Sequence, residues 1–131
     1  MLHTTYGIVL KTIKYAETSV ITKVYTEAFG VQSYIVNGVR STKSKNNKAG
    51  LLQPLTLLDM VVYYKEGRDL HRISEMKNAF IFTAIPFEVV KRSIGIFMVE
   101  IMSKSIREEE SNPDQFEFLW NAVQLLDQTP G

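Results

Sequence analysis

The chain has 131 residues, of which 45% are apolar, enough for one hydrophobic core and the beginning of another. It contains no cysteine, which excludes disulfides, a thiolate zinc site and a catalytic cysteine. No apolar run approaches the ~18 residues of a membrane span, and the first residues lack the pattern of a secretory signal. We therefore expect a soluble protein of the cytoplasm, with no membrane partner.

The net charge of +1 hides an asymmetry between the two parts of the chain. Residues 1–80 hold 11 Lys and Arg against 6 Asp and Glu, whereas residues 81–131 hold 4 against 8. A basic first part indicates a polyanionic partner, although solvated lysine-rich surfaces are also common without one.

The first 80 residues have the pattern of β-strands, because β-branched and aromatic residues alternate with polar ones between glycine-containing turns. Strands are predicted at residues 6–14, 18–26, 31–37, 55–65 and 70–77. Five short strands with a long insert after the third are the layout of an OB-fold, a partly open barrel. The expected barrel core consists of alternate apolar positions, namely Ile8, Leu10, Val20, Val24, Val31, Ile35, Leu57, Val61 and Ile73.

Beyond residue 80 the apolar period changes to about 3.6 residues, which predicts helices. A first helix is expected from Pro86, in its first turn, to about residue 107. A second is expected at residues 113–127, with Asn112 as N-cap and Gln115 in a capping box. The apolar stripe of the first helix is Val90, Ile94, Phe97 and Ile101, widened by Met98 and Met102, and that of the second is Phe116, Leu119, Val123 and Leu126.

These helices cannot enclose their own apolar stripes, so they must pack on the barrel or on sequence beyond the chain. The prediction is therefore a mainly β protein with C-terminal helices. Residues 1–80 are expected to form an OB-fold nucleic-acid-binding domain, and residues 81–131 the start of a helical domain that is incomplete here.

The segment from Gly38 to Gly50 is the strongest candidate for a binding site. It has no apolar anchor between Val39 and Leu51 apart from Ala49, so it should be exposed and mobile. Cations on such a loop attract phosphate through Coulomb forces and counterion release, although a merely solvated loop would have the same composition. The four candidates are Arg40, Lys43, Lys45 and Lys48.

Aromatic and basic residues on the strands supply further candidates, since bases stack on aromatic rings whatever their sequence. A small barrel also needs large side chains in its core, so each ring has two possible roles. The aromatic candidates are Tyr15, Tyr25, Phe29 and Tyr34, and the basic ones are Lys11, Lys14 and Lys23.

Catalysis is not expected. His3 and His71 have no carboxylate or thiol at a metal-ligand or triad spacing, and His71 is predicted on the solvent face of a strand. The acidic run at residues 108–110 is typical of a solvated helix end, and no phosphate-binding glycine motif is present. We expect no metal and no cofactor.

A series of short motifs stands out within residues 7–77. The motifs are Gly7-Ile-Val-Leu-Lys-Thr, Tyr15-Ala-Glu-Thr, Phe29-Gly30, Gly38-Val-Arg40, Leu52-Gln-Pro-Leu-Thr-Leu-Leu-Asp59 and Tyr63-Tyr64. In order and spacing this series resembles the opening of the RecO family, and the segment beyond Pro86 resembles the family's next domain more loosely.

This resemblance implies a recombination mediator that binds single- and double-stranded DNA, anneals strands coated with single-strand-binding protein, and loads RecA together with RecR. It places the DNA surface on the basic strand and loop residues named above. The family's zinc-binding cysteines, and most of its surface for the tail of the single-strand-binding protein, would lie beyond this chain. Two other classes stay open: a barrel that docks an acidic protein, and an RNA-binding barrel.

Overall fold

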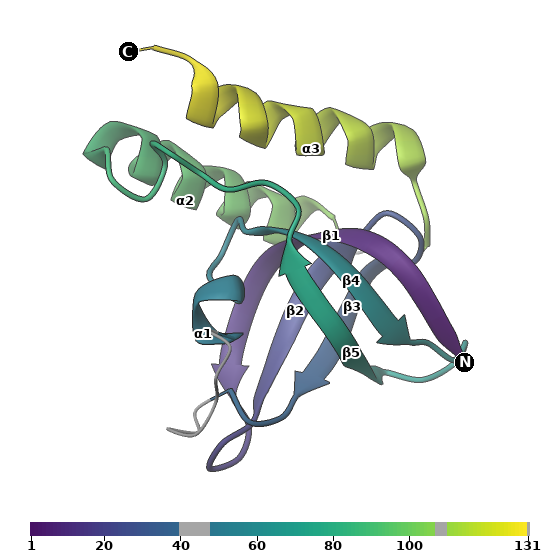
Figure 1. Cartoon of the computed structure of the whole chain (residues 1–131). Coiled ribbons are helices and arrows are strands. Elements are labelled where there is room, and N and C mark those ends of the chain that lie inside the picture. Colours follow the sequence, from purple (N-terminus) through teal and green to yellow (C-terminus); the bar gives the residue numbers. More distant parts are fainter. Residues whose placement is uncertain (40–47, 107–109, 131) are drawn as a thin grey trace.

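The computed structural model describes residues 1–39, 48–106 and 110–130, which form a β-barrel with helices over one end (Figure 1). The elements in chain order are β1 (Leu2–Lys14), β2 (Val20–Thr26), β3 (Gly30–Val36), α1 (Lys48–Leu51), β4 (Leu57–Tyr63), β5 (Leu70–Asn78), α2 (Val89–Ser105) and α3 (Pro113–Gln128).

The strands close into a barrel in the order β1-β2-β3-β5-β4, which confirms the predicted five-stranded OB-fold followed by helices. β1 is long enough to pair with two strands: its first part pairs with β4 and its second part with β2. A register shift between Val9 and Lys11 bends the strand where its partners change. The barrel closes through a short parallel pairing of β3 with β5, from Ser33–Leu70 to Ile35–Arg72.

Strand bounds differ from the sequence prediction in every strand, and two of the differences have a clear cause. β1 begins at Leu2 rather than at residue 6, because its first residues pair with β4. β4 begins at Leu57 rather than at residue 55, because Leu55 has a φ of 75°, which no β-strand contains. The amide of Leu55 donates instead to the carbonyl of Val9 (2.7 Å), so this residue turns the chain into the barrel.

The apolar core has two parts. One fills the barrel and includes Val9, Val24 and Met60, and the other lies between the barrel and the helices and includes Ile8 and Leu10. β1 is therefore buried on both of its faces at residues 8–10. Seven of the nine predicted core residues are buried, whereas Ile35 and Val61 are only half-buried.

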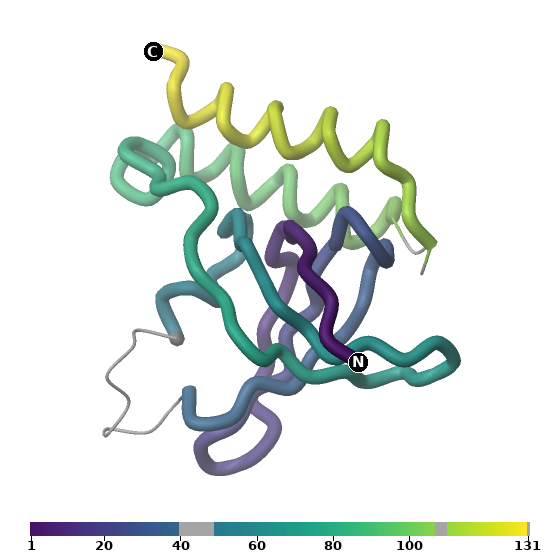
Figure 2. The backbone as a smooth tube through the Cα atoms, turned by 45° about the vertical axis from the view of Figure 1, so that its right-hand side comes forward, coloured from purple at the N-terminus to yellow at the C-terminus, as the bar shows by residue number. Residues whose placement is uncertain are grey.

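Helices α2 and α3 lie side by side across the end of the barrel (Figure 2). The predicted stripe of α3 faces the core, with Phe116 and Val123 fully buried. Asn112 caps the helix as predicted, since its side chain accepts from the amide of Gln115. Gln115 does not complete a capping box; its side chain accepts a hydrogen bond from the hydroxyl of Tyr25 (3.0 Å).

The predicted stripe of α2 is wrong in its orientation for its four main residues, although Met98 and Met102, which were predicted to widen it, do face the core. Val90, Ile94, Phe97 and Ile101 are all exposed, Phe97 by 63%, while the buried residues are Lys91, Gly95, Val99 and Met102. The helix also begins at Val89, after a turn in which the amides of Phe87 and Glu88 donate to the carbonyl of Ala84. Pro86 lies in that turn rather than in the helix.

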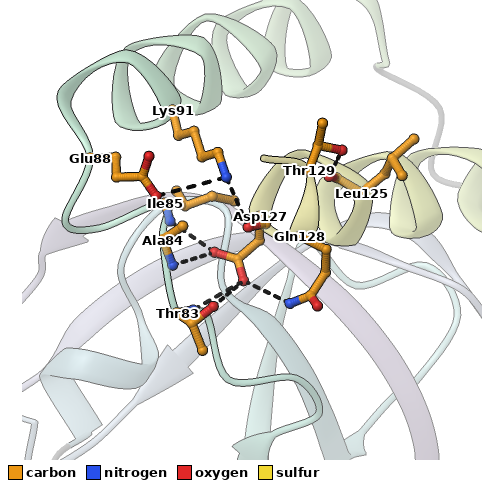
Figure 3. Close-up of polar contacts among 9 residues, drawn as sticks. All are labelled: Thr83, Ala84, Ile85, Glu88, Lys91, Leu125, Asp127, Gln128 and Thr129. Carbon is orange, nitrogen blue, oxygen red and sulfur yellow. Dashed lines mark hydrogen bonds and ion pairs between the residues drawn. The ribbon is translucent and has the colours of Figure 1, made fainter. Parts of the chain in front are cut away.

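The end of α3 is tied to the segment that links the barrel to α2 (Figure 3). The carboxylate of Asp127 accepts hydrogen bonds from the backbone amides of Thr83, Ala84 and Ile85. The ammonium of Lys91 donates to the backbone carbonyl of Asp127 (3.1 Å). Within the described part of the chain, no helix is long and apolar enough to cross a membrane.

Candidate nucleic-acid interface

Two lysines stand directly opposite each other on the outer surface of the barrel. Lys11 of β1 is paired with Lys23 of β2, and both side chains are exposed. Like charges on directly opposed strand positions, whose Cβ atoms lie about 5 Å apart, repel each other and weaken the sheet. A bound phosphate between them would remove that repulsion, so the pair is suited to an anionic ligand.

Strand register extends this basic position into a band around the barrel. Next to the lysine pair, Ile13 opposes Ile21, and Ile21 opposes Ile35. Ile35 in turn opposes Arg72 of β5, and Arg72 opposes Tyr63 of β4. We call this set of residues the outer band; it consists of Lys11, Lys23, Ile13, Ile21, Ile35, Arg72 and Tyr63.

The band ends at a pocket of about 450 Å³ beside the β4–β5 hairpin. Lys65, Arg68 and Arg72 supply its cations, and Tyr63 and Leu70 supply apolar surface. Tyr63 and Leu70 are 45% and 37% exposed. Cations beside accessible aromatic and apolar surface are the combination that single-stranded nucleic acids require.

Lys65, Arg68 and Arg72 were not among the basic candidates, because the sequence prediction placed the DNA surface on the first two strands and on the loop after the third. Arg72 could have been found by strand alternation. It lies between His71 and Ile73, which are both buried, so its own side chain must point outward. Arg68 follows Gly67, whose φ of 87° closes the turn and leaves the flanking side chains in solvent.

Two of the four aromatic candidates are corrected by their burial. Tyr25 is 1% exposed and packs against Phe116, with the ring centroids 5.4 Å apart. Tyr34 is fully buried inside the barrel, and this burial raises the pKa of its phenol, which stays neutral. Neither ring can stack on a base in this structure.

The other two aromatic candidates differ in access. Phe29 is half-buried, and one face of its ring is covered by Tyr64, with the centroids 3.8 Å apart and the planes nearly parallel. Tyr15 is 57% exposed on the connection between β1 and β2, near Lys14, which is also exposed. Tyr15 is therefore the predicted aromatic residue that remains accessible.

The predicted basic loop falls mostly outside the described residues. Arg40, Lys43 and Lys45 lie there, and Lys48 is described only as the first residue of α1.

Both histidines lie in a group of aromatic rings. The sequence prediction that His71 faces solvent is wrong, because the residue is buried. Its ring stacks on Tyr64, with the centroids 4.7 Å apart. His3 lies edge-on to Phe29 in the same aromatic group. Over residues 1–39, 48–106 and 110–130, no three His, Asp or Glu side chains gather as metal ligands would.

Comparison with known proteins gives a consistent assignment. A family model described as "Recombination protein O N terminal" matches residues 1–82. The chain is 42% identical over 123 residues to a protein of Flavobacterium psychrophilum named DNA repair protein RecO, covering 94% of this chain and 52% of that protein. Proteins of the same name from Bacteroides fragilis and Phocaeicola vulgatus are 39% and 37% identical over 127 and 128 residues, covering 97% and 98% of this chain.

This chain spans about half the length of the curated relatives that it matches, 52% to 53% in these three cases. The family match nevertheless covers residues 1–82, which is more than half of the chain and includes the whole barrel. The protein therefore belongs to the RecO family of DNA repair proteins.

Proposed function

We propose that this chain binds DNA, single- and double-stranded, through the outer band and the basic loop that follows β3. The observation that carries the proposal is the exposed, directly opposed pair Lys11–Lys23 on the barrel of a RecO family member. Two like charges held face to face weaken a sheet unless a ligand neutralises them. The predicted loop residues Arg40, Lys43, Lys45 and Lys48, together with Lys14, would add phosphate contacts.

The wider role that we propose is that of a recombination mediator in the cytoplasm. In that role the complete protein would anneal strands, bind the tail of the single-strand-binding protein, and load RecA together with RecR. Since the chain spans half of its relatives, annealing and partner binding are proposals for the whole protein, whereas DNA binding is a proposal for this barrel. We propose no catalytic activity and no cofactor.

A salt titration of oligonucleotide binding tests the proposal. Fluorescence anisotropy with a labelled single-stranded oligonucleotide should give an affinity that falls steeply with salt. Replacing Lys11 and Lys23 by alanine should reduce the slope of log K against log salt by about 1.4, from about 0.7 for each lost single-strand contact. At about 0.1 M salt, that change corresponds to about 25-fold weaker binding than the parent.

The matched control removes two lysines from the other end of the molecule. Lys77 lies at the helix end of β5, and Lys104 lies in the last turn of α2. The double variant Lys77→Ala, Lys104→Ala should keep the parent's slope. Equal slopes for the parent and the Lys11→Ala, Lys23→Ala variant would refute the outer band as a DNA surface. Tighter binding to a matched RNA would favour an RNA-binding barrel instead.

A further inference from the structure

The pocket beside the β4–β5 hairpin is lined by three cations that form no ion pair with any described residue, and by no carboxylate. The cations are Lys65, Arg68 and Arg72, while Glu66 and Asp69, in the same hairpin, are exposed and do not line the pocket. Both ion pairs among the described residues lie elsewhere, at Lys77–Asp59 and Lys91–Glu88. An anion in the pocket would therefore meet three cations that have no competing carboxylate at contact distance.

The aromatic wall of the pocket is packed against other rings. The ring of Tyr64 is stacked between Phe29 and His71, with centroids 3.8 Å and 4.7 Å away. Tyr64 is half-buried, and its faces are occupied by these neighbours. Tyr63, its neighbour in sequence, is 45% exposed and takes part in none of the ring pairs found among the described residues. Tyr63 is the ring in this pocket that has a face available to a ligand.

The volume of the pocket also restricts its ligand. About 450 Å³ lies within the range of roughly 300–1,000 Å³ that is usual for pockets holding small organic groups. The pocket is open on one side and lies at the end of the outer band, so a chain running along the band would reach it. A base within a duplex has both faces and its pairing edge occupied, which prevents it from entering such a pocket.

We infer that this pocket receives one nucleotide of a DNA single strand, with the base stacked on Tyr63 and the adjoining phosphate held by Arg68 and Arg72. This inference rests on the proposed DNA binding and assigns a place to the base, which the lysine pair does not. Leu70, at 37% exposure, supplies the apolar surface next to the base. The pocket thus adds a preference for single strands to the electrostatic attraction of the band.

The first experiment separates base binding from phosphate binding. It compares an oligothymidylate with an abasic strand of the same length and phosphate number, by anisotropy at fixed salt. The parent should bind the thymidylate strand about tenfold more tightly, as expected for one stacked base. Tyr63→Ala should reduce this ratio to near one, and Tyr63→Phe should restore it, because stacking requires the ring and not the hydroxyl.

The second experiment tests the cations. Arg68→Ala with Arg72→Ala should lower the salt slope by about 1.4 for both strands and leave the thymidylate-to-abasic ratio above one. The control pair Lys77→Ala, Lys104→Ala should change neither quantity. All four residues are exposed, and far-ultraviolet circular dichroism should show the parent's melting curve for each variant.

A photocrosslink locates the base directly and does not depend on any substitution. A strand that carries one 5-iodouracil, irradiated on the unaltered protein, should give an adduct that mass spectrometry maps to Tyr63. An adduct at Tyr15, or equal affinity of the parent for thymidylate and abasic strands, would overturn the pocket assignment while leaving DNA binding intact. If the parent binds neither strand, the proposed function itself fails.

Discussion

At the scale of single residues, Asp127 has the densest set of polar contacts in the described structure (Figure 3). Its residue exposure is 2%, and burial alone would raise the pKa of the carboxyl group. The hydrogen bonds from the backbone amides of Thr83, Ile85 and Ala84, and from the side chain of Gln128, outweigh burial and hold the pKa below its ordinary value. The carboxylate is therefore charged at neutral pH and stabilises the fold.

Asp127→Asn should destabilise the protein by about 2 kcal/mol at pH 7, because an amide group replaces one of two charged acceptor oxygens. The folded pKa lies below the unfolded one, so the stabilisation is present above about pH 4 and is lost as pH falls through the folded pKa. Urea denaturation from pH 7 to pH 3 should show the gap between parent and variant narrowing below about pH 4. Asp69→Asn, in an exposed turn, is the control; a constant gap would contradict the role assigned to Asp127.

At both Gly7 and Gly95, an added Cβ atom would come closer than 3.0 Å to a neighbouring side chain, but the two surroundings differ. A Cβ on Gly7 would lie 2.5 Å from Cγ1 of Val24 and 2.8 Å from Cε of Met60, inside the filled barrel. A Cβ on Gly95 would lie 2.9 Å from Cδ2 at the end of the Leu55 side chain and at an ordinary contact distance of 3.5 Å from Cγ2 of Ile85.

Gly7→Ala should therefore cost about 1 to 3 kcal/mol of stability through overpacking. For Gly95→Ala, the gain of about 1 kcal/mol in helix propensity should offset most of the strain, leaving stability close to the parent's. Urea midpoints of the two variants test this contrast. A Gly7→Ala midpoint equal to the parent's would mean that the barrel interior can accommodate a methyl group at Gly7.

At the scale of elements, the period of each segment was predictable from the sequence, but the face that it buries was not always predictable. In α3, the apolar stripe and the buried face coincide, since Phe116 and Val123 are its most buried apolar residues. In α2, apolar residues cover more than one stripe, and two positions on the buried face are Lys91 and Gly95. Neither has the character of a core residue, so periodicity alone selected the wrong stripe.

The same limit explains what was found and missed in the candidate site. Charge identified Lys11 and Lys23, because a charged group in a strand must reach water. Tyr25 stayed a candidate for base stacking besides its possible core role, because the helix that covers it lies 90 residues further along the chain, as its hydrogen bond to Gln115 shows. The register that brings Arg72 beside Ile35 depends on how the barrel closes, which no local pattern in the chain encodes.

The orientation of α2 can be tested with two phenylalanines. Phe97 is 63% exposed, and Phe116 of α3 is 2% exposed. Phe97→Ser should change stability by less than about 0.5 kcal/mol, as expected for a surface site. Phe116→Ser should cost about 3 to 5 kcal/mol, because it removes a ring from the centre of the core. A comparable loss for Phe97→Ser in urea denaturation would show that the predicted stripe, and not the observed face, is buried.

At the scale of the whole molecule, the barrel and the helices share one apolar cluster. Ile8, Leu10 and Tyr25 of the barrel are buried together with Val99 and Met102 of α2 and with Phe116 and Val123 of α3. Ring contacts reinforce this junction, at 5.4 Å between Tyr25 and Phe116 and at 5.2 Å between Tyr6 and Trp120. Loss of either part would expose apolar surface of the other.

We therefore expect the barrel and helices to unfold together in a single transition. Trp120 is the only tryptophan and lies on α3 against Tyr6 of β1, so its fluorescence reports the junction. Its urea transition should coincide with that of the far-ultraviolet circular dichroism signal, as two-state unfolding requires. Val24 is fully buried and belongs to the cluster inside the barrel, not to the cluster that the barrel shares with the helices. If the two parts unfold together, Val24→Asp should nevertheless lower both midpoints by the same amount. A fluorescence midpoint that stays at the parent's urea concentration, while the circular dichroism midpoint falls, would show that the helices hold their packing without the barrel.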